Sequence, residues 1–436
     1  MQTLVWQNLT AVARRTALAR PASGDAKQVR AAAQTIIDDV QRDGEPALLS
    51  LTARFDRALL TSLLVTDQEI CAARAVLPAS ATAAIERAIG NVMRFHAATA
   101  SAPIALEVEP GVHCERVLRP LQSVGLYVPA GSAPLPSSAI MLAVPATLAG
   151  CPQRIVCTPA RADGTADPAV LVAASLAGAT AIFKLGGVQA IAAMAYGIGP
   201  VPKVVKVFGP GNAWVTAAKQ IVAADPAGAA IDMPAGPSEV LIIADETARA
   251  DWVAADLLAQ AEHDPLSQAV LLTDSAPLID ATRAALLTQV RSLSRQNVLR
   301  ESVAAMRLIL VPDLDTALRI CEDYAPEHLI IETREPRRWL ASITTAGSVF
   351  LGHHTPESIG DYCSGTNHVL PTYGYARAYS GLGLPDFQRR MTVQELTPAG
   401  LQSLGPIAVT LAHLEGLDAH ARAVTIRADN DQRGTS

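Results

Sequence analysis

The sequence predicts an α/β fold made of two doubly wound units, each built on a parallel sheet. The chain has 436 residues and is 50% hydrophobic, which is enough for more than one core. From about residue 115, short β-branched runs alternate with alanine-rich helical stretches, and this rhythm is typical of parallel α/β sheets. Glycine turns join two of these runs to the helices that follow.

The elements can be assigned in chain order. Residues 25–100 predict helices, because apolar residues recur at three-to-four spacing in 29–51, with a break at 43–46. In the next unit strands are predicted at 154–157, 181–185 and 204–208, and helices after Pro168 and at 213–223. The last unit has predicted strands at 240–244, 269–272, 308–311 and 329–331. The turn-rich segment 232–237 predicts the boundary between the two units.

This assignment divides the chain into four parts. Residues 25–127 with 239–380 form a first Rossmann-like domain that carries most of the candidate site, and 128–238 form a second. Residues 1–24 and 381–436 are small helical terminal segments. Because no GxGxxG occurs, both domains are incomplete Rossmann-like units that lack the usual dinucleotide fingerprint.

Charge and hydropathy exclude several classes of partner. The net charge is −6 and no dense run of Lys or Arg occurs, so neither nucleic acid nor a membrane surface is expected to bind. The uncharged stretch 168–183 is shorter than the roughly 18 to 20 apolar residues of a membrane span. The first 24 residues carry Arg14, Arg15 and Arg20 without acids, but no apolar segment follows as in a targeting signal. We therefore expect a soluble, cytoplasmic protein.

The six cysteines include no CxxC pair, so neither a disulfide framework nor a thiolate zinc site is indicated. They are expected to be small buried hydrophobic residues. Cys363 lies beside Asp361, which leaves a reactive thiol as the alternative there.

Two short polar islands interrupt the apolar chain. Gln260 and His263 have the three-residue spacing that puts them on one helix face, where they could share a metal or simply be solvated. Glu327 and His328 precede a predicted strand, where they could divide proton transfers or form an ordinary surface pair. Asp361, in a segment that reads as a loop, is a candidate third ligand.

Two glycine turns resemble nucleotide-binding connections. One is Gly209–Asn212 after the strand 204–208, and the other is 185–189 with Gln189. Backbone N–H groups at such a helix N-terminus can approach a phosphate or a ribose. The spacing alone is equally compatible with ordinary sharp α/β connections.

Taken together, these segments resemble the histidinol dehydrogenase family from about residue 25 to His420. The matching stretches are 125–136, Gly209–Asn212 with 217–219, 232–240, 260–263, 325–329, 360–372 and 414–420. Ala130 departs from the glycine that is more frequent in the family, which affects only the expected conformation of its loop.

The resemblance implies site residues and cofactors. It implies one Zn²⁺ per subunit and an NAD site in the second domain. The implied zinc ligands are Gln260, His263, Asp361 and His420, and the implied NAD contacts are Tyr127, Gln189 and Asn212. The implied substrate contacts are Ser238, Gln260, His263, His328, Asp361, Glu415 and His420. It also implies a homodimer in which the C-terminal segment donates Glu415 and His420 to the partner's site.

The implied reaction is the oxidation of L-histidinol through L-histidinal to L-histidine, with two NAD⁺ reduced. His328 would take the alcohol proton and Glu327 would activate the water that attacks the aldehyde. The alternatives are a related zinc- and NAD-dependent dehydrogenase of another small alcohol, such as a sulfonated diol, a zinc hydrolase, and a metal-binding protein without turnover. Glu415 argues against the first alternative, because a carboxylate suits a cationic substrate.

Overall fold

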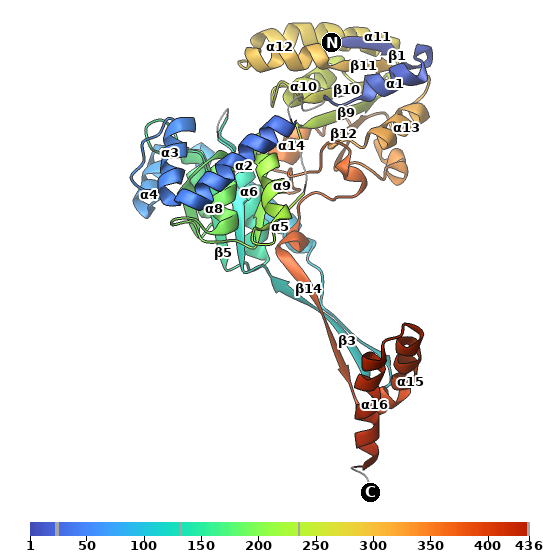
Figure 1. Ribbon diagram of the computed structural model, residues 1–436. Coiled ribbons are helices and arrows are strands. Elements are labelled where there is room, and N and C mark those ends of the chain that lie inside the picture. Colours follow the sequence, from blue (N-terminus) through green and yellow to red (C-terminus); the bar gives the residue numbers. More distant parts are fainter. Residues whose placement is uncertain (22–25, 131–132, 234–235, 434–436) are drawn as a thin grey trace. The chain divides into compact units, whose positions relative to one another are not determined.

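The computed structural model describes residues 1–21, 26–130, 133–233 and 236–433, with the side chains of 26 and 429–433 excepted. The chain forms two compact units (Figure 1). Unit 1 comprises Met1–Thr99 and Leu121–Phe387, and unit 2 comprises Ala100–Pro120 and Gln388–Ser436. No helix among the described residues is both long and apolar enough to span a bilayer.

Unit 1 contains a six-stranded parallel sheet in the order β1-β11-β10-β9-β12-β13. Its strands are β1 (Gln2–Val5), β9 (Glu239–Ala244), β10 (Gln268–Thr273), β11 (Arg307–Leu310), β12 (His328–Glu332) and β13 (Ser348–Leu351). Helices cover both faces, because alternate residues of β9 enter different cores: Val240 and Ile242 lie in one, and Leu241 and Ile243 in the other. The helices of this half are α10 (Ala250–Ala261), α11 (Ala276–Gln289), α12 (Gln296–Ala305), α13 (Leu314–Tyr324) and α14 (Glu357–Tyr362).

A second, five-stranded parallel sheet in unit 1 has the order β6-β5-β4-β7-β8. Its strands are β4 (Ser123–Tyr127), β5 (Gln153–Thr158), β6 (Ala181–Lys184), β7 (Lys206–Phe208) and β8 (Ala230–Ile231). Its own helices are α6 (Pro136–Leu148), α7 (Pro168–Leu176), α8 (Gly187–Tyr196) and α9 (Ala213–Ala224). Without β1, both sheets have the chain order 3-2-1-4-5 of doubly wound folds. The predicted α/β class is confirmed.

The helices from residue 26 to residue 98 pack with the helices of the five-stranded sheet, which differs from the predicted grouping of 25–127 with 239–380. They are α2 (Ala26–Asp43), α3 (Glu45–Phe55), α4 (Asp67–Val76) and α5 (Ala79–Ala98). Helix α1 (Ala11–Leu18) differs from them, because its Leu18 packs against a core of the six-stranded sheet. Helix α2 contacts α8 and α9, α4 contacts α7, and α5 contacts α6. Amphipathic spacing predicts such helices but does not reveal which sheet they cover. The predicted boundary segment 232–237 includes residues 234–235, which lie outside the described residues. The predicted boundary at residue 24 also lies outside the described residues.

Unit 2 is built on a three-stranded antiparallel sheet, which the sequence analysis did not predict. Strand β14 (Gln388–Leu396) pairs with β3 (Val112–Pro120), and β3 pairs with β2 (Ile104–Glu109) (Figure 1). Helices α15 (Pro398–Leu414) and α16 (Asp418–Arg433) pack on each other in the same unit. The C-terminal segment is therefore a strand followed by two helices.

Short 3-10 helices complete the described elements. They are η1 (Trp6–Asn8), η2 (Val290–Ser292), η3 (Pro336–Ser342), η4 (Tyr375–Arg377) and η5 (Leu384–Phe387). The N-terminal segment, predicted to be helical only, also supplies β1 as an edge strand beside β11.

A buried carboxylate closes the carboxyl end of β12. Glu332 is 1% exposed, and burial raises its pKa to about 8, with a further contribution from Asp256. The unfolded chain ionises this group near its ordinary pKa of 4.5, so the folded protein holds a proton that the unfolded chain releases. The free energy of unfolding should therefore fall as the pH rises from about 4.5 to about 8.

Glu332→Gln should flatten this part of the stability profile, because the amide stays neutral. Melting temperatures at pH 5.5 and 8.5 measure the effect, and the variant should gain several degrees over the wild type at the higher pH only. The control is Glu335→Gln, the same change at an exposed position. An identical pH slope in the wild type and in Glu332→Gln would refute the assignment.

Candidate active site

The polar islands meet at the amino edge of the six-stranded sheet. Glu327 comes directly before β12, and its neighbour His328 is paired in register with Val240 of β9. Helix α10 runs back across the sheet and brings Gln260 to the edge where β10 begins. The helix ends at Ala261, so His263 lies in the connection to β10 and not, as predicted, on the helix itself. Open α/β sheets usually bind ligands at their carboxyl edge. In this protein the acid and imidazole groups lie at the opposite edge.

The backbone of Glu239 holds Glu327 and His328. The Glu239 N–H donates to Oε2 of Glu327 at 2.8 Å, and Nδ1 of His328 lies 3.1 Å from the Glu239 carbonyl oxygen. A neutral His328 that donates its Nδ1–H to this carbonyl keeps the lone pair on Nε2. The imidazole is therefore set up to accept a proton at Nε2. Both side chains are buried, at 5% and 4% exposure.

Carboxylates surround this imidazole. Nδ1 of His328 lies 3.6 Å from Oε2 of Glu327 and 3.6 Å from Oε1 of Glu357, and Nε2 lies 3.5 Å from Oδ1 of Asp361. Burial alone would lower the pKa of His328, but Glu357, Glu327 and Asp361 outweigh it and raise that pKa well above its usual value. Burial raises the pKa of Glu327 to about 8, although His328 acts in the opposite direction. Three carboxyl groups thus surround one imidazole, and this excess of potential negative charge can stabilise a cation.

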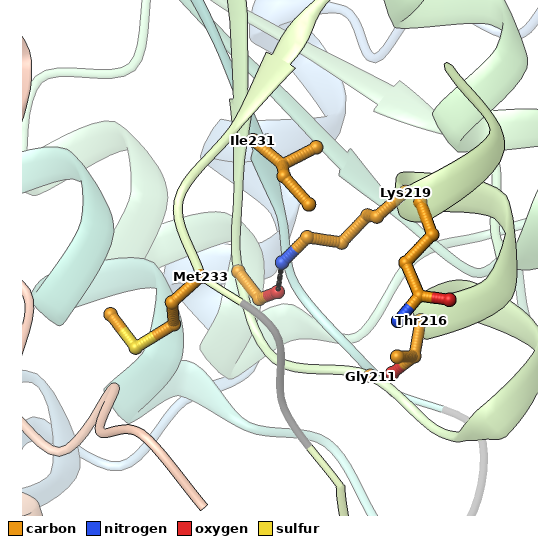
Figure 2. Close-up of a pocket in the computed structure, with 7 residues that line it drawn as sticks. Gly211, Thr216, Lys219, Ile231 and Met233 are labelled. Atoms are coloured by element: carbon orange, nitrogen blue, oxygen red, sulfur yellow. Dashed lines mark hydrogen bonds between the residues drawn. The ribbon is translucent and has the colours of Figure 1, made fainter. Parts of the chain in front are cut away.

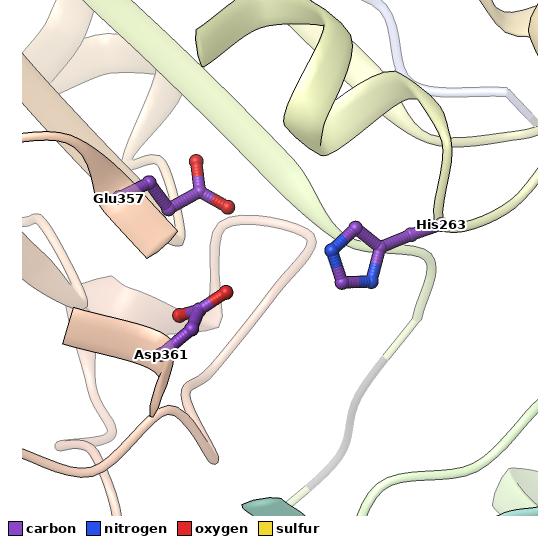
Figure 3. A group of neighbouring side chains, drawn as sticks. All are labelled: His263, Glu357 and Asp361. Atoms are coloured by element: carbon purple, nitrogen blue, oxygen red, sulfur yellow. The ribbon is translucent and has the colours of Figure 1, made fainter. Parts of the chain in front are cut away.

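His263, Glu357 and Asp361 could share a metal ion (Figure 3). They offer one ligand atom each, and these atoms lie within 4.8 Å of one another. Glu357 and Asp361 are four residues apart on α14, so they share a helix face. Residues 360–362 are therefore helical, and the expectation of a loop there is wrong. The helix begins at Glu357, directly after Pro356, and it includes Gly360, a residue type that favours turns over helix interiors.

Gln260 reaches the same group from α10. Its side chain is fully buried. With the amide turned so that nitrogen faces acceptors, Nε2 donates to Oε1 of Glu357 at 3.0 Å and to the Glu239 carbonyl oxygen at 3.2 Å. This orientation leaves the amide oxygen available as a ligand. The structure thus brings together three of the four implied zinc ligands, Gln260, His263 and Asp361.

Glu357 is a functional candidate that the sequence analysis missed. It is 1% exposed, and burial raises its pKa well above the usual value. The signal that could have found it is its four-residue spacing to Asp361, which was hidden by reading the segment as a loop. His368 also supports the site, since its Nδ1 lies 2.8 Å from the Asp361 carbonyl oxygen.

The implied nucleotide-binding residues lie at the carboxyl edge of the five-stranded sheet. Tyr127 ends β4, and Gly209 follows the adjacent strand β7, at the point where the strand order reverses. This is the usual ligand position of doubly wound sheets. Gly209 has φ +125, and a Cβ there would lie 2.2 Å from the Tyr127 carbonyl oxygen, so the turn requires glycine. Asn212 is exposed and caps α9, accepting from Trp214 N at 3.1 Å.

The second glycine turn is held by Tyr127. The Gly187 N–H donates to the Tyr127 hydroxyl oxygen at 3.1 Å, and burial raises the pKa of this phenol to about 12. Gln189, in the first turn of α8, is buried. Tyr127 therefore supports the turn that carries Gln189, and direct contact of either residue with NAD stays a prediction.

A buried ion pair supports the first glycine turn. Lys219 donates from Nζ to the Gly209 carbonyl oxygen at 2.8 Å (Figure 2). Lys219 also forms a salt bridge with Asp232. Oδ2 of Asp232 in turn accepts from the Gly209 N–H at 2.8 Å. The pair therefore fixes the backbone of Gly209 on both sides. The pocket beside it, lined by Gly211 and Met233 among others, has about 10 Å³ and does not hold a ligand larger than water.

Three implied residues remain: Ser238, Glu415 and His420. Ser238 precedes β9, and its carbonyl oxygen accepts from Gln268 N at 3.0 Å. Glu415 and His420 belong to unit 2, where both are exposed at the junction of α15 and α16. Their role in a site stays a prediction.

Fold and site together define an α/β enzyme with a buried acid–imidazole pair beside a metal-binding group. A family model described as histidinol dehydrogenase matches residues 19–428. Histidinol dehydrogenase of Xanthomonas campestris pv. campestris is 56% identical over 98% of this chain and 99% of its own, and that of Vibrio vulnificus is 52% identical over the same shares. The crystal structure of histidinol dehydrogenase from Elizabethkingia anophelis superimposes with a TM-score of 0.93 at 42% identity, covering 99% of each chain.

The chain belongs to the histidinol dehydrogenase family. It is accordingly a dehydrogenase, an enzyme of the oxidoreductase class. The resemblance inferred from the sequence is confirmed, and the reading as a metal-binding protein without turnover is set aside.

Proposed function

We propose that the protein oxidises L-histidinol to L-histidinal and then to L-histidine, reduces two NAD⁺ and consumes one water. These would be the last steps of histidine biosynthesis, carried out in the cytoplasm. The observation that carries the proposal is the buried Glu327–His328 pair next to His263 and Asp361, in a chain of this family. A two-step oxidation needs a base for the alcohol and a base for water, and this pair supplies both.

The donor set fits one Zn²⁺ per subunit. Gln260, His263 and Asp361 offer oxygen and nitrogen without thiolate, and among the described residues His328 is the only side chain in ion-pair distance of the carboxylates of Glu327, Glu357 and Asp361. A divalent cation would balance this excess of negative charge. When bound, Zn²⁺ would act as a Lewis acid that anchors the imidazole and amine nitrogens of histidinol.

The chain's own residues would move the protons. In the first oxidation Nε2 of His328 takes the hydroxyl proton while the carbon gives a hydride to NAD⁺. In the second, Glu327 takes a proton from the water that adds to the aldehyde. The resulting hydrate anion gives the second hydride to another NAD⁺ and becomes the carboxylic acid. The raised pKa of Glu327 suits a base that returns its proton between turnovers. We assign substrate contacts to Ser238, Gln260, His263, His328, Asp361, Glu415 and His420.

The five-stranded sheet would bind NAD. Tyr127 and Asn212 lie where its strand order reverses, the position that doubly wound sheets use for nucleotides, and Gln189 lies on the neighbouring turn. The turn at Gly209 brings backbone N–H groups to the start of α9, where a negatively charged pyrophosphate would be stabilised.

Unit 2 would form a homodimer and complete the partner's site. Strand β2 is exposed along its whole length, with Ile104, Leu106 and Val108 among its side chains. Helix α15 adds exposed Ile407 and Leu411. Apolar surface of this extent in a small unit is typical of an interface. A partner seated there would receive His420 as a zinc ligand and Glu415 as a substrate contact, and both side chains are exposed in their own unit.

Mixing inactive protomers tests donation in trans. His263→Ala and His420→Ala should each be inactive alone, but a heterodimer would contain one intact site. Random pairing should therefore restore about one quarter of the wild-type rate. Replacing the His420→Ala protomer by the double variant should restore nothing. No activity from heterodimers proven by mass spectrometry would contradict the proposal.

The function itself is tested by giving the purified, zinc-loaded protein L-histidinol and NAD⁺ and following the absorbance of NADH. Two NADH per histidinol are expected. A zinc hydrolase would give none, and a dehydrogenase of another alcohol, such as a sulfonated diol, would respond to that alcohol only. Absence of NADH with histidinol would overturn the proposal.

A further inference from the structure

The backbone of Glu239 holds Glu327 and His328, and the side chain of Glu239 is in turn bound by a residue of the N-terminal segment. Glu239 binds Glu327 through its N–H and His328 through its carbonyl oxygen, so any shift of this one residue moves both side chains. Its own carboxylate is fully buried. A buried carboxylate is costly unless it is paired, so its partner decides where the residue rests.

Arg20 is that partner. Its Nη2 donates to Oε2 of Glu239 at 2.9 Å, and its Nε donates to Oε1, which makes the pair bidentate. Oε1 also accepts from Tyr373 N at 3.1 Å. The guanidinium side chain is 15% exposed. Within the described residues, no other side chain is in salt-bridge distance of Glu239.

The same guanidinium group holds the turn that leads into β12. Nη2 of Arg20 donates to the carbonyl oxygens of Tyr324 at 2.7 Å and of Ala325 at 3.3 Å, and the group lies over the Tyr324 ring at 4.0 Å. Ala325 has φ 52, a left-handed conformation that residues other than glycine rarely adopt. This residue lies two positions before Glu327. Arg20 therefore holds Glu327 and His328 in place in two ways: through Glu239 of β9 and through the turn that precedes β12.

We propose that Arg20 and Glu239 are positioning residues for the two bases, Arg20 acting through Glu239 and through the turn at Ala325. The expected effect of this role on kcat rests on the proposed function. The role makes Arg20 a determinant of where the two bases lie, although Arg20 does not belong to the metal-binding group.

The test compares Arg20→Gln with the wild type in the zinc-loaded full chain. kcat should fall by about 10- to 100-fold, as for other residues that orient a reacting group, whereas KM for NAD⁺ should change by less than about 2-fold. Arg20→Lys should restore part of kcat, because it keeps the charge but not the fork. Glu239→Gln should resemble Arg20→Gln, and combining the two should cost less than the sum of the single effects.

A second readout does not need turnover. Long-range ¹H–¹⁵N spectra of the histidine rings, with His328 assigned from a His328→Gln sample, report the hydrogen bond at Nδ1. Arg20→Gln should shift this resonance. If wild-type protein makes no NADH while the resonance still shifts, the proposed function fails and the positioning role stands.

Arg14→Gln is the matched control. Arg14 belongs to the same segment but contacts the Trp6 carbonyl oxygen at 3.3 Å and the Trp6 ring. This variant should keep both kcat and the His328 resonance. If Arg20→Gln lowers the melting temperature but leaves kcat and the resonance as in the wild type, Arg20 is structural and the inference is overturned.

Discussion

Glu327→Gln should stop the reaction after the first oxidation. The amide can still accept the hydrogen bond from Glu239 N, so the geometry of the site should survive. It cannot take a proton from water, and a general base of this kind is worth roughly 10² to 10⁴ in rate. Only the second oxidation needs water activation, so that step should lose most of this factor.

Single-turnover experiments separate the two steps. With histidinol, the variant should release close to one NADH at nearly the wild-type rate, followed by a slow second phase. With L-histidinal as substrate, only the slow phase should appear. Equal losses in both steps would contradict the division of work between Glu327 and His328.

His263→Ala should abolish both zinc binding and turnover. His263 follows the end of α10, and Asp361 lies on α14. Loss of the single imidazole removes the only nitrogen ligand that unit 1 offers among the implied ligands. Zinc content by atomic emission and NADH production measure the two effects together. Dialysis of the wild type against a chelator should give the same inactive state, reversed by added Zn²⁺.

His354→Ala is the control for this change. His354 lies against the Trp252 ring, with centroids 5.1 Å apart, and takes no part in the site. The His354→Ala variant should keep the wild-type zinc content and the wild-type rate of NADH production. Full activity of metal-free His263→Ala protein would exclude a zinc-dependent mechanism.

The sequence predicts the strands well because parallel strands are buried on both faces. Runs such as 240–244 and 329–331 are continuously apolar, and they correspond to β9 and β12 within one or two residues. Edge and antiparallel strands lack this signal. Strand β2 is exposed at every position and β1 carries no buried residue, so neither could be found from hydrophobicity.

Within the site, local spacing predicts which residues a few positions apart are neighbours. It does not predict residues that are far apart in the chain and that the sheet brings together. The three-residue spacing of Gln260 and His263 predicts neighbours, and they are neighbours although α10 ends at Ala261, before His263. Spacing does not predict Glu239, since its contribution comes from backbone groups that any residue type possesses. The sequence predicts no role for Arg20 in the site, because nothing near it in the chain shows that a carboxylate over 200 positions later is its partner.

Strand β1 also sets an order of assembly. Gln2 pairs with Arg307, so β1 cannot join its sheet until roughly 300 further residues have been made. During that interval the N-terminal segment has no sheet to join, and the clamp from Arg20 cannot form. Catalytic competence should therefore arise late in folding, and a bulky N-terminal fusion would act on the last step of maturation instead of on the stability of the finished sheet.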